Sequence, residues 1–484
     1  MTDKPAAAHD SGTPENLLRF MLSGWATPPS TPAQPIDGVV ECGRRREALA
    51  EAFPGESLIV PTGHEKVRAN DTTYRFRPGT DFYYLTGNTE PDNVLVLAAG
   101  GAATLYCEPH PGKTDATFFT DRAKGELWVG PRLGLEQTAL RYGIAAKPLR
   151  ALTEDLAALI AAGEYRVLRG IDPQLDAAAP AQPDRDAALA TALSEQRLIK
   201  DELEVRELRR AIEATHRGFE DVVRALPSAQ TERTVEGVFN LRAREDGNDV
   251  GYTTIAASGP NACTLHWTRN DRRLRDDELL LLDAGVEAET LYTADITRTL
   301  PVSGRFSPEQ RAIYELVLEA QEAAFARCRP GNDFLEPNRA AMEVLARGLE
   351  RLGILPSAQE ALREENAFYR RYSLHNVSHM LGLDVHDCAA ARAETYKFGQ
   401  LREGMVLTVE PGLYFQLDDL TVPARYRGIG VRIEDDVLIT ATGVEVLSAA
   451  IPRAADEVEA WVSAARSSSD PAESRPEGAR RPSR

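Results

Sequence analysis

Hydrophobic and polar residues follow two different periods along this chain, and each period predicts a different element. Short runs of β-branched and aromatic residues, such as "SLIVPTG", "NVLVLAA" and "ATLYCEP", are bounded by Gly, Pro or Asn and predict strands. They alternate with helical patterns such as "LTEDLAALIAAG". Residues 37–175 are therefore predicted to form an α/β domain.

The second half of the chain opens with a stretch whose apolar residues recur at helical spacing. The spacing predicts a long amphipathic helix with one apolar face, made by Val205, Leu208, Ile212, Phe219 and Val222. A second helix is predicted to begin after Ser307, because "SPEQ" supplies the N-cap serine, the proline and the glutamine of a capping box, and to end at Pro330-Gly331. Between these helices, the stretch from Leu279 to Leu300 predicts two strands joined by the polar turn "EAET".

Chain length and the composition of the two ends set the predicted domain plan. At 484 residues the chain exceeds the size that one hydrophobic core usually supports, so two domains are expected. Residues 1–36 and 456–484 are rich in small and polar residues, and both segments are predicted to be largely disordered. The looser segment 176–197 is predicted to be a linker, and residues 198–455 the second domain.

Charge and cysteine content narrow the possible partners. With 56 Lys and Arg against 74 Asp and Glu, the net charge is -18, which argues against binding to nucleic acid or to an anionic membrane. The five cysteines are scattered and form no C-x-x-C pair, as expected in a reducing compartment. The chain shows neither a secretory signal nor an apolar run long enough to span a membrane. We therefore predict a cytoplasmic location.

Carboxylates placed inside apolar strand patterns are the main sign of chemistry. Asp283 and Asp295 lie in "LLLLDAGVEAETLYTADITRTL", Glu410 in "VLTVEPG" and Glu434 in "GVRIED". Each could by itself be a turn carboxylate, an arginine partner or an exposed strand residue, just as His379 could be a core histidine. Four carboxylates and one imidazole facing one core, however, would require cations.

A charge count suggests which cations these would be. Two Asp and two Glu with a neutral His carry a charge of about -4, which two divalent ions would cancel, and an oxygen-rich set with one imidazole suits Mn²⁺ or Co²⁺. The chain has no H-E-x-x-H zinc motif, no phosphate-binding loop and no dinucleotide fingerprint. The residues thus favour a dinuclear metal site.

The order of these motifs resembles a known family. An Asp pair in a hairpin, "HNVSHMLGLDVH", "VEPGLY" and "RIED" are similar to the motifs of the pita-bread metallopeptidases, and within them of the Xaa-Pro aminopeptidase family. The resemblance covers residues 198–452, and "RPGTDFYYLTGNTEPDNVLVL" resembles that family's N-terminal domain. It implies an N-terminal α/β domain followed by a pita-bread catalytic domain, whose curved, mostly antiparallel sheet is backed by helices.

The resemblance also assigns roles to individual residues. It implies that the metal ligands are Asp283, Asp295, His379, Glu410 and Glu434, with Asp295 and Glu434 bridging two ions. It further implies imidazoles and other groups that orient the site or face the substrate, namely His266, His375, His386, Arg432 and Tyr414.

The implied reaction is hydrolysis of the bond between the first residue of a peptide and a proline in second position. A water held between two ions, Mn²⁺ foremost, would attack, with Glu410 accepting its proton. His386 and His266 would bind the tetrahedral intermediate and help to protonate the leaving proline. The free amine of the peptide would lie against a metal and Asp283. Members of the family tend to be dimers or tetramers, so a homo-oligomer is expected.

Several alternatives remain open at this stage. A prolidase, which acts on Xaa-Pro dipeptides, uses the same ligands and a similar domain plan. A methionine aminopeptidase fits less well because the chain has an additional N-terminal domain, and a metal-free creatinase-like hydrolase is disfavoured by the intact ligand set. A non-catalytic peptide-binding module of the same fold is the alternative from another class of function.

One feature departs from the family pattern. Eleven residues separate Asp283 from Asp295, one more than is usual in the family. An extra residue inside a strand would turn one aspartate to the opposite face of the hairpin. We therefore predict that it lies in the turn or forms a bulge, with "EAET" as the polar, turn-like stretch that could absorb it while both carboxylates face the same side.

Overall fold

The structure is a computed structural model that describes residues 12–26, 33–70 and 72–468. It divides into two compact units, Met1–Leu193 and Ser194–Arg484. None of the helices in the described residues combines the length and the apolar character needed to cross a membrane.

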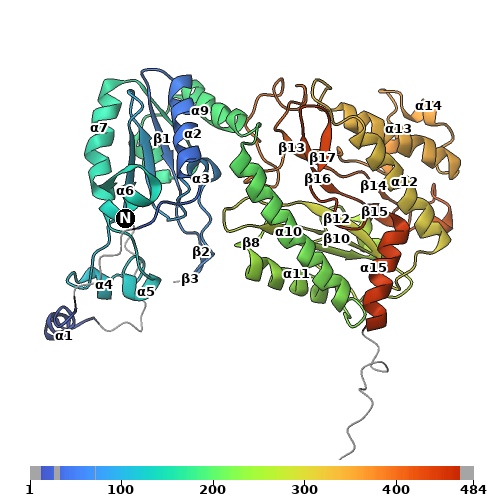
Figure 1. Cartoon of the computed structure of the whole chain (residues 1–484), viewed down its shortest axis with the longest axis horizontal. Helices are drawn as coiled ribbons and strands as arrows, with labels where there is room; N and C mark the ends of the chain where they lie inside the picture. Colours follow the sequence, from blue (N-terminus) through green and yellow to red (C-terminus); the bar gives the residue numbers. More distant parts are fainter. Residues whose placement is uncertain (1–11, 27–32, 71, 469–484) are drawn as a thin grey trace, which may run out of the picture. The chain divides into compact units, whose positions relative to one another are not determined.

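The first unit is built on a five-stranded mixed sheet (Figure 1). Its strand order is β6-β5-β4-β1-β7, with bounds Ala145–Pro148, Ala103–Cys107, Val94–Leu97, Ser57–Pro61 and Tyr165–Val167. The outer pairs β5–β6 and β1–β7 are parallel and the inner pairs are antiparallel. The helices are α1 (Glu15–Met21), α2 (Val39–Ala52), α3 (Thr80–Thr86), α4 (Thr117–Thr120), α5 (Glu126–Val129), α6 (Leu135–Tyr142), α7 (Leu152–Ala162) and α8 (Pro173–Ala178). A small hairpin joins β2 (Val67–Ala69) to β3 (Thr72–Thr73).

The second unit combines short antiparallel sheets with long helices (Figure 1). One three-stranded sheet has the order β12-β10-β9 (Ile296–Pro301, Leu279–Ala284, Ile255–Ser258), and another β13-β16-β17 (Val406–Val409, Asp435–Ile439, Val444–Val446). Two-stranded pairs are formed by β14–β15 (Gly412–Tyr414, Gly430–Arg432) and β11–β8 (Val286–Glu287, Asp249–Val250).

Two pairs of helices pack together in this unit (Figure 1). Helices α10 (Glu202–Ala225) and α11 (Glu232–Asp246) form one pair, and α12 (Pro308–Phe325) and α13 (Glu336–Arg351) the other. The short helix α14 spans Ala358–Ala361. The predicted capping box at Ser307 is confirmed, although α12 ends at Phe325, before Pro330. One continuous apolar core lies between these helices and the strands, because the apolar face of a sheet must be buried against another element.

The two strands of the hairpin that carries the two aspartates pair in one constant register up to the turn. Asp283 pairs with Thr297, and the same offset continues to the bridge between Glu287 and Thr293. Asp295 lies two residues before Thr297 and therefore on the same face as Asp283. The chain reverses between Ala288 and Tyr292, where Leu291 takes a left-handed conformation (φ 64°). The turn absorbs the extra residue, as predicted.

The end of the second unit differs from its prediction. Residues from 456 onward were expected to be largely disordered, but α15 (Ala455–Ser468) packs into the core of the second unit. Val458 and Val462 are fully buried, because apolar residues recur there at helical spacing within a polar sequence. Residues 469–484 lie outside the described part of the chain.

The predicted linker and the predicted disordered N-terminal segment also contain helices. Helix α9 (Pro183–Gln196) occupies most of the 176–197 segment and buries Leu189 and Leu193. Helix α1 lies within the 1–36 segment and has no buried residue. Of that segment, residues 1–11 and 27–32 are outside the described part.

Candidate metal centre

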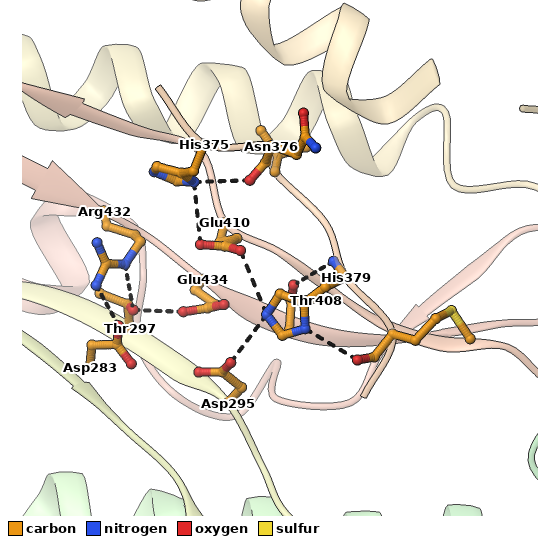
Figure 2. A network of polar contacts seen from close by, with 12 residues as sticks. Asp283, Asp295, Thr297, His375, Asn376, His379, Thr408, Glu410, Arg432 and Glu434 are labelled. Atoms are coloured by element: carbon orange, nitrogen blue, oxygen red, sulfur yellow. Dashed lines mark hydrogen bonds and ion pairs between the residues drawn. The ribbon is translucent and has the colours of Figure 1, made fainter. Parts of the chain in front are cut away.

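The five residues predicted to bind metal come from four segments of the second unit and point toward one another (Figure 2). Asp283 is in β10 and Asp295 directly precedes β12. His379 lies in the irregular segment between Arg371 and Val406, Glu410 follows β13, and Glu434 separates β15 from β16. We call these five residues the ligand cluster.

The potential ligand atoms of the ligand cluster lie close to one another. His379 Nε2 lies 3.4 Å from Asp295 Oδ2 and 3.7 Å from Glu410 Oε1. One potential ligand atom from each of Asp295, His379 and Glu434 lies within 4.8 Å of the others. These atoms could contact a common ion after small adjustments of the side chains.

Three carboxyl groups of the ligand cluster, those of Asp283, Glu410 and Glu434, have pKa values raised above their ordinary values. Burial raises the pKa of Glu434 well above its ordinary value, and the charges of Asp295 and Glu410 raise it further. Burial also raises the pKa of Asp283, although Arg432 opposes the rise. The pKa of Glu410 rises to about 7, mainly because of burial, while His379 and Arg432 act to lower it. These carboxyl groups are short of compensating positive charge.

The imidazole of His379 also shows that the ligand cluster lacks positive charge. Burial alone would lower the pKa of His379, but hydrogen bonding to Asp295 and the charge of Glu410 raise it to about 9. A divalent cation would remove the need for these extra protons. The oxygen-rich donor set with one imidazole therefore fits divalent metal ions.

Tyr252, which the sequence analysis did not find, links the two aspartates of the hairpin. Its hydroxyl lies 2.6 Å from Asp283 Oδ1 and 2.5 Å from Asp295 Oδ1. A phenol has one hydrogen to donate, so one of the two contacts needs a proton on a carboxyl group. Tyr252 lies far from both aspartates in sequence and in no recognisable pattern, so only the fold reveals its role.

Arg432 and Thr297 orient the opposite side of the site (Figure 2). Arg432 donates through Nη2 to Asp283, through Nη1 to Tyr414 Oη at 2.9 Å, and through Nε to Thr297 Oγ1 at 3.1 Å. Thr297 in turn donates to Glu434 Oε2 at 2.7 Å. Strand alternation could have revealed Thr297, because it shares a face with Asp295.

His375 and His386, two of the histidines that the resemblance implies near the ligands, have different environments. His375 Nε2 lies 2.8 Å from Tyr414 Oη, and its Nδ1 lies 3.5 Å from Glu410 Oε2. Burial, followed by the charge of Arg432, lowers its pKa to about 4, so the ring is neutral at physiological pH. The exposed ring of His386 packs edge-on against His379, with centroids 4.3 Å apart.

His266 is the third of the histidines that the resemblance implies near the ligands. Its side chain is exposed, and its proximity is seen in its electrostatic effect on the pKa values of His375 and His386, both of which it lowers.

The raised pKa of Glu410 predicts how the metal-free protein responds to pH. Because this pKa rises from 4.5 to about 7 on folding, the stabilising contribution of the protonated group is present below 4.5 and is lost as pH rises through 7. Without metal, Glu410→Gln is expected to match wild type at about pH 4.5 and to be more stable at about pH 8, by at most about 3 kcal/mol.

Denaturant unfolding in the presence of a chelator measures this difference. The matched control is Glu445→Gln on β17, a glutamate whose side chain is 44 % exposed and pairs with Arg209. A stability difference between Glu410→Gln and wild type that is the same at both pH values would contradict the assignment.

A buried set of four carboxylates and one imidazole on a curved antiparallel framework defines a metal-dependent hydrolase as the class of protein. Comparisons with known proteins agree. Residues 206–441 match the model of metallopeptidase family M24, and residues 42–168 match that of the aminopeptidase P N-terminal domain.

Relatives extend this agreement over nearly the whole chain. Xaa-Pro aminopeptidase 1 of Streptomyces coelicolor is 50% identical over 460 residues, which are 94% of this chain and 93% of the relative. Xaa-Pro aminopeptidase of Escherichia coli is 36% identical over 88% of this chain and 98% of its own length. The structure of E. coli aminopeptidase P with the inhibitor Pro-Leu superposes with a TM-score of 0.80 at 34% identity, covering 90% of this chain and all of that one.

The chain belongs to the Xaa-Pro aminopeptidase family within metallopeptidase family M24. The predicted family and fold class are thereby confirmed, with an N-terminal α/β domain followed by a pita-bread domain.

Proposed function

We propose that this protein is an Xaa-Pro aminopeptidase, which releases the first residue from peptides that carry proline in second position. The observation that supports it most strongly is the complete ligand cluster, with four carboxylates and His379 converging in one buried site. Relatives that bear the name Xaa-Pro aminopeptidase match both units of the chain.

The ligand cluster would hold two divalent ions, for which we propose Mn²⁺. When bound, such ions lower the pKa of a water and polarise the scissile carbonyl. Asp295 and Glu434 would be shared by the two ions, a role supported by their potential ligand atoms, which lie within 4.8 Å of each other and of one from His379. Asp283, Glu410 and His379 would complete the set.

Glu410 is the proposed general base. Its carboxyl group lies between the two histidines His375 and His379, and its pKa is about 7 in the metal-free protein. The pKa would be lower with metal bound, and the carboxylate would then be ready to accept the proton of the attacking water. Next to Glu410, the neutral ring of His375 forms a hydrogen bond with the hydroxyl group of Tyr414.

Cleavage before proline also requires a proton at the leaving nitrogen, because the bond is a tertiary amide. His386 and His266 are the proposed donors and oxyanion partners, since both are exposed and lie near the ligand cluster. Asp283, held by Arg432, is proposed to receive the free amine of the peptide. Recognition of that amine restricts cleavage to the first residue.

A three-peptide assay tests this function. Metal-stripped protein reloaded with Mn²⁺ is offered an Xaa-Pro dipeptide, a longer peptide with proline in second position, and the same longer peptide with alanine there. We expect rapid cleavage of the longer Xaa-Pro peptide and none of the alanine peptide. Cleavage confined to the dipeptide would assign a prolidase, and failure to bind Mn²⁺ or to cut any peptide would indicate a non-catalytic module.

We propose that the protein is a cytoplasmic homo-oligomer, either a dimer or a tetramer. All five cysteines are buried and none of them forms a disulfide, in keeping with a reducing compartment. Light scattering on the purified protein measures the oligomeric state. Peptides are the proposed partners, and the net charge of -18 disfavours nucleic acid.

A further inference from the structure

A second cluster of buried charges lies in the same unit, beside the ligand cluster but separate from it. Arg197 Nε donates to Asp387 Oδ1 at 3.0 Å, and Lys200 Nζ donates to Asp387 Oδ2 at 2.8 Å. The three side chains are 4%, 0% and 1% exposed. Because burying such groups costs more than their attraction usually returns, domain stability alone is a weak explanation for the cluster. We call Arg197, Lys200 and Asp387 the Asp387 anchor.

Asp387 closes the loop that carries two of the site histidines. Its backbone N–H donates to the carbonyl oxygen of Met380 at 2.9 Å. His379 directly precedes Met380 and His386 directly precedes Asp387, so the closure brings the two imidazoles to the same end of the loop. Their ring centroids are 4.3 Å apart.

The Asp387 carboxylate is packed tightly against the middle of this loop. A Cβ atom added to Gly382 would lie 2.1 Å from Asp387 Oδ2 and 2.8 Å from Lys200 Nζ, so the close approach requires glycine. The carbonyl oxygen of Gly382 accepts from the N–H of Thr293 at 3.0 Å, in the hairpin that carries Asp295. The anchor thus fixes the histidine loop against the aspartate hairpin.

The cations of the anchor belong to residues 195–200, which comprise the end of α9 and the start of its connection to α10, and this segment holds the loop at further points. The Lys200 N–H donates to the carbonyl of Gly404 at 2.8 Å. Glu195 accepts from Arg392 Nε at 2.6 Å and from Thr395 Oγ1 at 2.8 Å. The loop after His386 is therefore attached along this segment.

We propose that the Asp387 anchor positions His386 for proton transfer and oxyanion binding. Arg197, Lys200 and Asp387 are positioning residues, which act through His386 without touching substrate. This inference rests on the proposed function, because it assigns a task to a histidine of that site.

A double-mutant cycle with Lys200→Met and His386→Ala tests the proposal on Mn²⁺-loaded protein and the longer Xaa-Pro peptide. In the wild-type background, Lys200→Met is expected to lower kcat about 10- to 100-fold through misplacement of the imidazole, with KM within about 3-fold. In the His386→Ala background, the same change is expected to lower kcat less than about 3-fold, because its target is absent.

Two further measurements separate positioning from general stability. In metal-free Lys200→Met, amide hydrogen exchange at Asp387 is expected to be at least about 10-fold faster, with the amides of α10 unchanged. Arg166→Met, which removes a largely buried ion pair with Glu56 in the first unit, is the control and should leave kcat within about 2-fold.

If Lys200→Met does not fold, Arg197→Gln replaces it in the same cycle, since Lys200 then still pairs with Asp387. An equal loss of kcat in both backgrounds, or wild-type kcat in the anchor variant, would overturn the proposal. Failure of the proposed function itself would look different, because the wild-type protein would then leave Xaa-Pro peptides intact.

Discussion

Replacement of Glu410 by glutamine is expected to lower kcat/KM for a longer Xaa-Pro peptide by at least about 1000-fold. The amide keeps the size of the side chain but cannot accept a proton from the attacking water. The fold should persist, because a neutral group already suits this buried position, as the pKa of about 7 indicates. Steady-state kinetics at saturating Mn²⁺ and thermal unfolding measure the two effects.

The control for this variant is Glu445→Gln, which makes the same chemical change at a partly exposed position of the same unit. Its kcat/KM should equal that of the wild type. Activity of Glu410→Gln within about 10-fold of wild type at full metal occupancy would remove Glu410 from the role of general base.

Replacement of Asp295 by alanine is expected to remove both metal binding and activity. Asp295 contacts His379 and Tyr252, and its charge raises the pKa values of three other carboxyl groups, so it lies at the centre of the site. Metal affinity should fall by at least about 100-fold, which exceeds the usual effect of removing a residue that only supports a ligand. Equilibrium dialysis with Mn²⁺ and peptide cleavage measure the losses.

Asp276→Ala is the matched control, because Asp276 is exposed and pairs only peripherally, with Arg466. It should bind Mn²⁺ and cut peptides like the wild type. Undiminished Mn²⁺ binding by Asp295→Ala would mean that the ions lie elsewhere in the chain.

The sequence was most informative where charged residues interrupt patterns that are otherwise apolar. Asp283, Asp295, Glu410 and Glu434 stand out because carboxylates conflict with apolar strand patterns, and the structure gathers them with His379 in one place. Strand register restricted the extra residue between the two aspartates to the turn or a bulge, and the regular pairing in the structure places it in the turn.

Other features depend on contacts between distant segments and left no pattern to find. Tyr252 is an isolated tyrosine in the sequence, and only the structure shows its contact with Asp283. Asp387 follows His386 in a histidine-rich motif, and only the structure shows that Arg197 and Lys200 pair with it. Helix α15 was missed for a different reason. The polar composition of the last residues concealed the helical spacing of Val458 and Val462.

Calorimetric titration of the metal-free protein with Mn²⁺ at about pH 6.5, in buffers of different ionisation enthalpy, tests the central claim most directly. The raised pKa values of Glu434, Asp283 and Glu410 predict that binding releases protons from the ligand cluster. We expect two ions per chain and a release of at least about one proton, both abolished in Asp295→Ala. Absence of binding, or binding without proton release, would contradict the account.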